Sequence, residues 1–313
     1  MGDALLCVRG LKVGFPTVDG VVKASNAVDL TIQAGETLAL LGETGSGKTV
    51  LGMAILRLLQ PNTRIEGEIL YRGRDLLSLP QEEMQKIRGR EIAVVLQNSG
   101  TSLNPVLRVG DQIAEAITLH RGLKGAEAEA AAVELLERVR IADPARMARE
   151  YPHRFSGGMR ERALIALALA CSPSFLIADE PTRGLDAVTK HEILALFSEI
   201  NRGRSVLFIT HDIEAAATLA TRVAVMYAGE IVEIGPVDAV LSSPAHPYTR
   251  GLLESLPARG MRPIPGSAPS LIAPPSGCRF FPRCSCSVGR CETEHPGLVP
   301  VGPGHCARCM LYD

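Results

Sequence analysis

The stretch Gly42-Glu43-Thr44-Gly45-Ser46-Gly47-Lys48-Thr49 decides the fold, because it fits the pattern G-x-x-x-x-G-K-[ST]. It follows an apolar run that ends at Leu41 and precedes a helical stretch at residues 50–59, the setting that a phosphate-binding loop requires. Glycines let backbone N–H groups converge on phosphate oxygens, and the helix N-terminus adds its positive end. Lys48 is expected to reach the terminal phosphates, and the Thr49 hydroxyl to coordinate Mg²⁺. The loop therefore predicts a nucleoside triphosphate site, with ATP the expected nucleotide.

The apolar runs around this loop indicate an α/β domain with a parallel core sheet. Four runs are predicted to be buried strands separated by helical stretches: residues 37–41, 92–96, 175–178 and 206–210. Three β-rich stretches, the last with a hairpin turn at Ala228-Gly229, predict an antiparallel β layer beside that sheet: residues 5–15, 24–32 and 222–235. Residues 127–139, rich in Ala, Glu and Leu, predict an exposed amphipathic helix within a helical subdomain at about residues 98–172.

Composition sets limits on the partners of the chain. The 313 residues include 33 basic and 34 acidic ones, so no overall field favours nucleic acid or an acidic membrane surface. The N-terminal residues lack the basic and apolar segments of a secretory signal, which predicts a cytosolic protein. The longest apolar run, residues 163–171, is shorter than the roughly 18 to 20 residues of a membrane-spanning helix. Any membrane association is therefore expected to go through a partner.

Two carboxylates follow the third predicted strand, in the sequence Phe175-Leu-Ile-Ala-Asp179-Glu180. Asp179 suits a Mg²⁺ ligand, and Glu180 suits a group that polarises the attacking water. The alternative is an ordinary acidic helix start before Pro181. The phosphate loop upstream favours the catalytic interpretation.

A glycine-rich helix start lies upstream of these carboxylates. Ser156-Gly157-Gly158 precedes a predicted helix at residues 160–170, with Ser156 as its expected N-cap, and such a helix start can hold a phosphate or be merely structural. Gln97 and His211 each follow a predicted strand and, taken alone, fit ordinary polar strand ends. Their functional interpretation depends on the order in which these motifs occur along the chain.

Together these motifs resemble the nucleotide-binding subunits of ABC transporters, over residues 5–256. Ser156-Gly157-Gly158 resembles the signature loop, Gln97 the Q-loop glutamine, Asp186 the D-loop aspartate and His211 the switch histidine. The resemblance implies a head-to-tail pair with a homologous subunit, in which ATP lies between residues 42–49 of one chain and the partner's signature loop. It also implies that Gln97 joins the Mg²⁺ site and that Phe15 stacks on adenine, the alternative for Phe15 being a core aromatic on a strand.

Two further segments resemble the oligopeptide, dipeptide and nickel importer branch: residues 101–106 and residues 243–253. This branch implies an ATPase at the cytoplasmic face of the membrane, driving two transmembrane permeases that receive a solute from an extracytoplasmic binding protein. The alternative is a soluble ABC ATPase, in iron–sulfur cluster assembly or another non-transport role. The nucleotide-binding domain is expected at residues 1–243 and a small extension at residues 244–313, where Pro and Gly rise sharply.

Six of the eight cysteines lie in the last 36 residues, which in a reducing compartment favours metal over disulfides. The segment Gly277-Cys278-Arg-Phe-Phe-Pro-Arg-Cys284 resembles the branch's C-terminal extension, which implies a [4Fe-4S] cluster on four thiolates: Cys278, Cys284, Cys291 and Cys309. Cys306 is the alternative fourth ligand, and Cys286 is extra. A Cys₄ Zn²⁺ site is the competing interpretation, although the wide spacings lack the close cysteine pairs usual for zinc. A disulfide framework is the least favoured.

Overall fold

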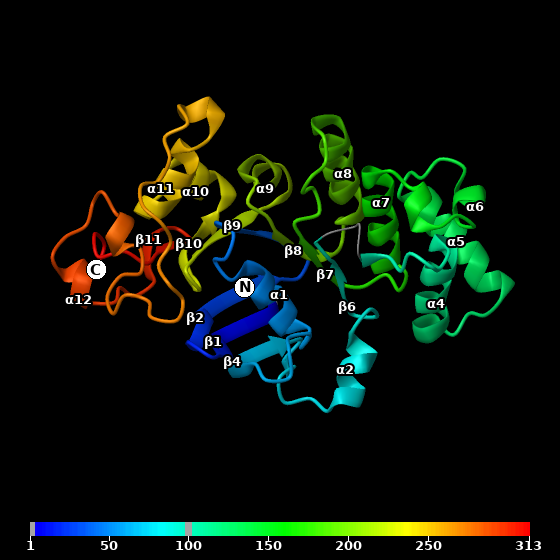
Figure 1. Cartoon of the computed structure of the whole chain (residues 1–313), viewed down its shortest axis with the longest axis horizontal. Coiled ribbons are helices and arrows are strands. Elements are labelled where there is room, and N and C mark those ends of the chain that lie inside the picture. The colour runs from blue at the N-terminus through cyan, green and yellow to red at the C-terminus, as the bar shows by residue number, and fades with distance from the viewer. Residues whose placement is uncertain (1–3, 98–101) are drawn as a thin grey trace. The chain divides into compact units, whose positions relative to one another are not determined.

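The structure is a computed structural model of the whole chain, and it describes residues 4–97 and 102–313. The chain divides into two compact units, Met1–Ser78 with Ile209–Asp313 and Leu79–Phe208 (Figure 1). The first unit contains the phosphate loop and the C-terminal extension. The second contains the two carboxylates, the predicted signature loop and the described residues of the predicted helical subdomain.

The first unit contains an antiparallel sheet, which confirms the predicted antiparallel layer. Its strands lie in the order β2-β1-β4-β5, and their bounds are β2 Gly20–Gln33, β1 Ala4–Thr17, β4 Arg64–Tyr71 and β5 Arg74–Asp75. Along β1, burial moves from the even positions Leu6 and Val8 to the odd positions Leu11 and Val13. The cause is a β-bulge between Arg9 and Lys12, which inserts one residue against β4 and so reverses the face that later side chains occupy.

A second set of strands in this unit carries the phosphate loop. Their order is β11-β12-β10-β9-β3, and their bounds are β11 Val299–Gly302, β12 His305–Ala307, β10 Glu230–Pro236, β9 Arg222–Tyr227 and β3 Thr37–Leu41. β3 is parallel to β9, whereas β9 and β10 form a hairpin whose turn residues Ala228 and Gly229 both have positive φ. The turn is confirmed, but its place in a separate antiparallel layer is wrong, because β9 pairs with the parallel strand β3.

The helices of the first unit are short. They are α1 Lys48–Ile55, α9 Ile213–Leu219, α10 Val237–Ser242, α11 Pro247–Glu254 and α12 Arg290–Thr293, with 3₁₀ turns at Pro257–Arg259 and Phe281–Arg283. The extension packs onto the same core as the hairpin, because Phe280 is buried with Tyr227 and Tyr248 in one cluster. The Pro-rich tail therefore takes its order from packing and from the pairing of β12 with β10.

The second unit contains the predicted parallel strands, in the order β8-β7-β6: β8 Ser205–Ile209, β7 Phe175–Asp179 and β6 Ile92–Val95. Every residue of β7 and β8 is buried, which explains their continuous apolar sequences. The helices are α2 Gln81–Ile87, α4 Val109–Arg121, α5 Ala126–Arg138, α6 Pro144–Met147, α7 Gly157–Ala168 and α8 Ala187–Ile200, with a 3₁₀ turn at Pro152–Arg154.

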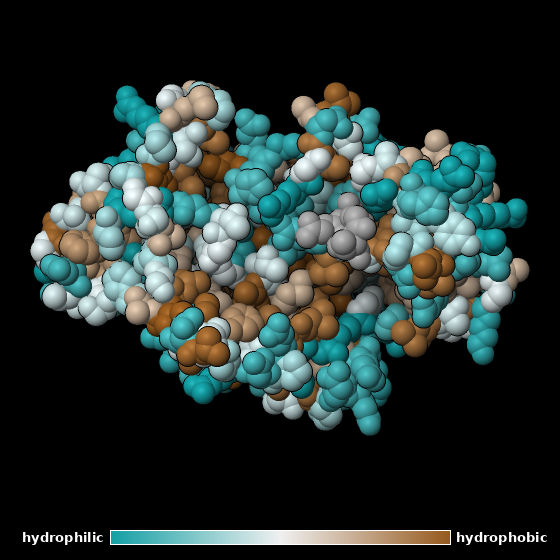
Figure 2. Space-filling view, in the orientation of Figure 1, coloured by the Kyte–Doolittle hydropathy of each residue, from teal (hydrophilic) through white to brown (hydrophobic). Residues whose placement is uncertain are grey.

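Helix α5 confirms the amphipathic helix predicted at residues 127–139. Its buried residues are Ala128, Ala132, Leu135 and Leu136, a spacing that keeps them on one face. Hydrophilic and intermediate residues cover most of the face visible in Figure 2, with apolar residues in smaller groups. In the part of the chain that the structure describes, no helix combines the length and apolar character needed to cross a membrane.

Candidate functional site

The phosphate loop joins β3 to α1, as the sequence predicts. Two of its glycines occupy places that no side chain could share. A Cβ on Gly42 would lie 2.2 Å from the Met226 carbonyl oxygen, and one on Gly47 would lie 2.2 Å from the Ala24 carbonyl oxygen. Their φ angles of 152° and 106° are also in the region that favours glycine. The loop backbone is therefore packed closely against the end of β9 and against β2.

The polar side chains of the loop are arranged around its own backbone. The buried Lys48 amine donates to the carbonyl oxygens of Gly42 and Glu43 at 2.7 and 2.9 Å. The Ser46 hydroxyl is buried and has no hydrogen-bond partner among the described residues. Thr44, Gly45 and Thr49 are exposed, so the mouth of the loop is open to solvent. An open loop with a lysine ammonium and outward-facing backbone at a helix N-terminus is suited to phosphate.

The two carboxylates stand at the end of β7 in the second unit. Asp179 is the last residue of the strand and is 1% exposed, and Glu180 follows it at 9%. Glu180 has a φ of 53°, a conformation that costs a side-chain-bearing residue on the order of 1 kcal/mol or more. Such strain is common where a side chain is aimed for function.

The predicted signature loop, Ser156 to Gly158, lies at the start of α7. The Ser156 hydroxyl accepts a hydrogen bond from the Met159 backbone N–H at 3.3 Å, which confirms the predicted N-cap, although the helix begins at Gly157 rather than at residue 160. Gly158 has no room for a side chain, because a Cβ there would lie 2.5 Å from Thr189 Cγ2. Ser156 and Gly157 are exposed. Gly158 of this loop therefore packs against Thr189, whereas Ser156 and Gly157 face solvent.

The other predicted site residues occupy strand ends and a helix cap. Phe15 is partly buried on β1 opposite Val22, and His211 is exposed directly before α9, both in the first unit. In the second unit, Gln97 lies just after β6, and Asp186 caps α8 by accepting the Val188 and Thr189 N–H groups at 3.1 and 3.0 Å. The hydrogen bonds from Thr189 hold the pKa of Asp186 below its ordinary value.

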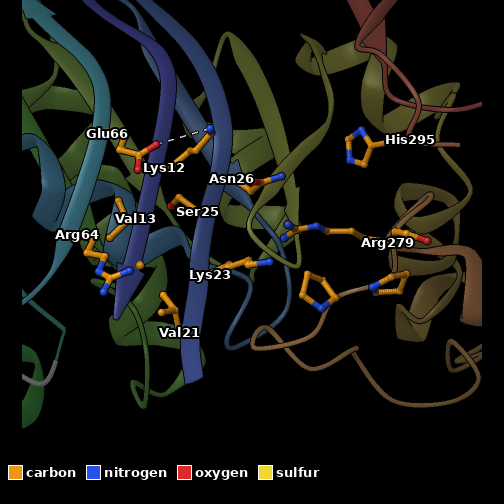
Figure 3. Close-up of a pocket in the computed structure, with 14 residues that line it drawn as sticks. Lys12, Val13, Val21, Lys23, Ser25, Asn26, Arg64, Glu66, Arg279 and His295 are labelled. Carbon is orange, nitrogen blue, oxygen red and sulfur yellow. Dashed lines mark ion pairs between the residues drawn. The ribbon is translucent and has the colours of Figure 1, made fainter. Parts of the chain in front are cut away.

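A cavity of about 590 Å³ in the first unit lies between the antiparallel sheet and the extension (Figure 3). Its charged lining is mainly basic, with contributions from Lys12, Lys23, Arg64 and Arg279, and it includes Glu66, which pairs with Lys12 at 3.7 Å. The predicted site residues lie elsewhere. Two residues of its lining, Arg279 and His295, belong to the extension and pair with Glu230 of β10.

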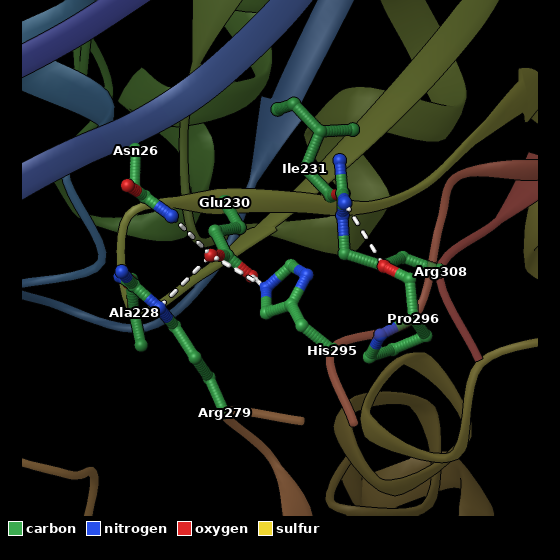
Figure 4. A network of polar contacts seen from close by, with 8 residues as sticks. All are labelled: Asn26, Ala228, Glu230, Ile231, Arg279, His295, Pro296 and Arg308. Carbon is green, nitrogen blue, oxygen red and sulfur yellow. Dashed lines mark hydrogen bonds and ion pairs between the residues drawn. The ribbon is translucent and has the colours of Figure 1, made fainter. Parts of the chain in front are cut away.

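Glu230 at the start of β10 ties the extension to this unit (Figure 4). Its buried carboxylate pairs with Arg279 Nε at 2.9 Å, with His295 Nε2 at 3.0 Å and with Asn26 Nδ2 at 2.7 Å. Burial by itself would raise the pKa of Glu230, but His295, Arg279 and Asn26 together hold that pKa below its ordinary value. Arg279 also donates to the carbonyl oxygen of Ala228 in the hairpin turn.

Sequence reasoning missed two residues that contact the phosphate loop, Tyr248 and Arg283, which hydrogen-bond to the N–H and the carboxylate of Glu43. Both lie in segments that the sequence marked only by their resemblance to the importer branch. No local signal could have linked them to Glu43, because 205 and 240 positions separate the partners.

The cysteines of the extension are free thiols. Burial raises the pKa of Cys278, Cys284 and Cys309, that of Cys284 to about 11, and neighbouring thiols raise each of them further. The Cys278 backbone N–H donates to the Cys291 carbonyl oxygen at 2.8 Å, so these two predicted ligands are neighbours. Cys306, on β12, pairs with Ile234 of β10. In residues 4–97 and 102–313, no group of three or more His, Cys, Asp or Glu side chains is placed to hold a metal ion.

A glycine-constrained phosphate loop between a buried strand and a helix defines a P-loop nucleotide-binding protein. The family profile described as ABC transporter matches residues 25–183, and that of the oligopeptide/dipeptide transporter C-terminal region matches residues 232–291. The chain belongs to the ABC transporter family, and it is an ATPase with the ABC nucleotide-binding fold.

Similar proteins agree with this assignment. A Brucella abortus protein named as a peptide import ATP-binding protein is 46% identical over 329 residues, covering 99% of this chain and 97% of the relative. The dipeptide transport ATP-binding protein DppD of Bacillus subtilis is 42% identical, covering 99% and 96%. The ATP-binding cassette MJ0796, solved as a dimer with ADP and phosphate, is 28% identical with a TM-score of 0.67, covering 74% of this chain and 98% of that one.

Proposed function

We propose that this chain is the ATP-hydrolysing subunit of an ABC importer that takes up peptides, or a related small solute such as nickel, through partner permeases. The observation that carries this proposal is similarity to peptide and dipeptide import ATP-binding proteins along the whole chain, extension included. The test is reconstitution with candidate permeases and binding protein in liposomes. Permease-stimulated ATPase activity and ATP-dependent peptide uptake are expected. Absence of stimulation would favour a soluble ABC ATPase instead.

The proposed partners are a homologous ATP-binding subunit in head-to-tail arrangement, two transmembrane permeases and an extracytoplasmic binding protein, with this chain at the cytoplasmic face. The exposed signature loop supports the pairing, because Ser156 and Gly157 are open to a second subunit. Residues 97–105 are the proposed permease contact; residues 98–101 lie outside the described part. Directly after this segment, Val106 and Leu107 expose 75% and 40% of their surfaces, as an apolar docking site requires.

In the proposed site, residues 42–49 hold the phosphates and Phe15 stacks on adenine. Thr49, Gln97 and Asp179 would hold Mg²⁺, since hydroxyl, amide and carboxylate oxygens are its preferred ligands. The bound Mg²⁺ would neutralise phosphate charge. His211 would contact the γ-phosphate, Asp186 would lie at the subunit contact, and Ser156 to Gly158 would cover the partner's ATP.

Glu180 is proposed to orient and polarise the attacking water. Glu180→Gln keeps the size of the side chain but removes its basicity, so ATP binding should persist while turnover falls by about 100-fold or more. Binding and phosphate release are measured on the same preparation. The exposed Glu127→Gln, on α5, is the matched control and should keep normal turnover. Near-normal turnover in Glu180→Gln would remove Glu180 from this role.

The extension is proposed to carry a [4Fe-4S] cluster on Cys278, Cys284, Cys291 and Cys309. The match of residues 232–291 to the oligopeptide/dipeptide transporter C-terminal region supports this, as does the contact between the Cys278 backbone N–H and the Cys291 carbonyl oxygen. Four thiolates can hold such a cluster, whereas a zinc site usually contains close cysteine pairs. Iron and sulfide, rather than zinc, are expected in anaerobically purified protein. Cys309→Ser should lose them and Cys306→Ser should keep them; the reverse pattern would reassign the fourth ligand.

A further inference from the structure

Two separate segments of the C-terminal part of the chain meet at one residue of the phosphate loop, Glu43. The Tyr248 hydroxyl on α11 accepts the Glu43 backbone N–H at 2.9 Å. Arg283 Nη1, one residue before Cys284, contacts the Glu43 carboxylate at 3.0 Å. The backbone and the side chain of this loop residue are thus both held by residues outside the loop motif.

Arg283 is fixed in a position from which it can act on the loop. Its side chain is 6% exposed, whereas that of Glu43 is 30% exposed. Its Nε donates to the Pro265 carbonyl oxygen at 2.9 Å, and its guanidinium lies over the Tyr227 ring at 5.8 Å. A guanidinium with three such contacts has a fixed orientation. The ion pair therefore restrains the Glu43 carboxylate, and the more exposed Glu43 does not determine the position of Arg283.

Tyr248 is equally constrained. It is fully buried, and its ring lies 4.5 Å from that of Tyr227 and 5.5 Å from that of Phe280. Burial raises its pKa and keeps the hydroxyl neutral, and the hydroxyl oxygen accepts the Glu43 N–H. Phe280 belongs to the same segment as Arg283. One packed aromatic cluster therefore supports both contacts to the loop.

The charge of Glu43 gives these contacts a consequence for ATP. An unpaired carboxylate in a loop that binds a triphosphate would repel it, because charges of the same sign a few ångströms apart raise the free energy of the complex. The Glu43 carbonyl oxygen is also one of the two acceptors that hold the Lys48 amine. We propose that Arg283 and Tyr248 are positioning residues of the nucleotide site, which neutralise and orient Glu43 so that the loop accepts ATP.

This inference rests on the proposed ATP site at residues 42–49, and it makes the cysteine-rich extension part of that site. Arg283 acts through Glu43, so its loss should weaken ATP binding without changing the chemical step. A residue that only stabilises the fold would instead reduce the active fraction, lowering kcat with KM unchanged.

The test compares Arg283→Gln, Glu43→Gln and the double variant, with the full chain used for ATP dissociation constants and the assembled transporter for KM and kcat. Arg283→Gln should raise Kd and KM about tenfold at nearly constant kcat, because it leaves the Glu43 charge unpaired. The double variant should bind about as tightly as Glu43→Gln, since both charges are gone. Arg9→Gln, which removes an exposed ion pair with Glu68 in the same unit, is the control.

Three results would overturn the inference: a Kd within twofold of wild type in Arg283→Gln, a fall in kcat alone, or a double variant as weak as Arg283→Gln. The last would mean that Arg283 attracts ATP directly. If Arg283→Gln does not fold, Tyr248→Phe, which removes one oxygen, must raise Kd by about threefold, and an unchanged Kd refutes the idea. Failure of the wild-type chain to bind ATP would refute the proposed site itself.

Discussion

Replacing Glu230 with glutamine is expected to lower the free energy of unfolding by about 3 kcal/mol. The two side chains of the Glu230–Arg279 pair are 3% and 5% exposed, and the substitution leaves the Arg279 charge buried without its counter-ion. Breaking a buried pair in this way costs roughly 3 to 5 kcal/mol. The lower value applies because glutamine has nearly the same volume, creates no cavity and still offers an oxygen to Asn26.

The assay is urea unfolding followed by circular dichroism, with the slope against urea compared between variants. Glu68→Gln is the matched control. It removes an ion pair with Arg9 whose side chains are 55% and 63% exposed, so its cost should stay below about 0.5 kcal/mol. The double variant Glu230→Gln/Arg279→Met should cost less than the sum of its single changes by about 2 kcal/mol.

A cost below about 1 kcal/mol for Glu230→Gln would refute this account. So would strict additivity in the double variant, because it would mean that the two side chains do not interact. Either result would mean that only packing and the β10–β12 pairing, and not the Glu230–Arg279 ion pair, stabilise the position of the extension.

Two further predictions concern the loop and the pH dependence of stability. Gly47→Ala should abolish measurable ATP binding, since its Cβ would lie 2.2 Å from a carbonyl oxygen. Gly45→Ala has open space and only a positive φ to oppose it, so it should cost about 1 kcal/mol of binding free energy. Equal effects of the two variants in equilibrium binding would contradict this. Burial lowers the pKa of His246 to about 3. As the pH drops below about 6.5, the unfolded chain therefore binds a proton at His246 that the folded chain does not, and the free energy of unfolding decreases by about 2 kcal/mol at pH 5. His246→Asn keeps an acceptor for the Tyr248 N–H and should remove this acid sensitivity in urea titrations at pH 7 and 5, whereas a pH profile identical to wild type would refute it.

The core strands could be predicted because their sequences are locally distinctive. Residues 37–41 coincide with β3, the strands predicted at 92–96 and 175–178 differ from β6 and β7 by one residue at one end, and the strand predicted at 206–210 is shifted by one residue from β8. Such strands are buried on both faces and are therefore apolar throughout. The turn at Ala228-Gly229 was equally clear. What these patterns do not contain is the neighbour of each strand, so the pairing of β9 with β3 was missed.

The order of the extension was also beyond local prediction. Its Pro and Gly content hides the short strands β11 and β12, and the residues that dock it, Arg279 and His295, look like ordinary surface residues in the sequence. Their role is visible only in the folded chain, where Arg279 and His295 pair with Glu230, because a buried carboxylate needs such partners. For the same reason the sequence could name cysteine ligands by resemblance but could not show that the backbones of Cys278 and Cys291 are in contact.

The sequence by itself determined the phosphate loop, because the glycines and the lysine that its pattern requires lie within eight consecutive residues. It also determined the family, since the motifs occur in a fixed order along the chain. Only the tertiary structure decided what surrounds the loop. Arg283 and Tyr248 reach Glu43 across more than 200 positions, and Glu230 collects Asn26, Arg279 and His295 from three separate segments. Contacts between residues so far apart leave no periodic or local pattern, because their energy comes from burial and charge pairing that exist only once the chain is folded.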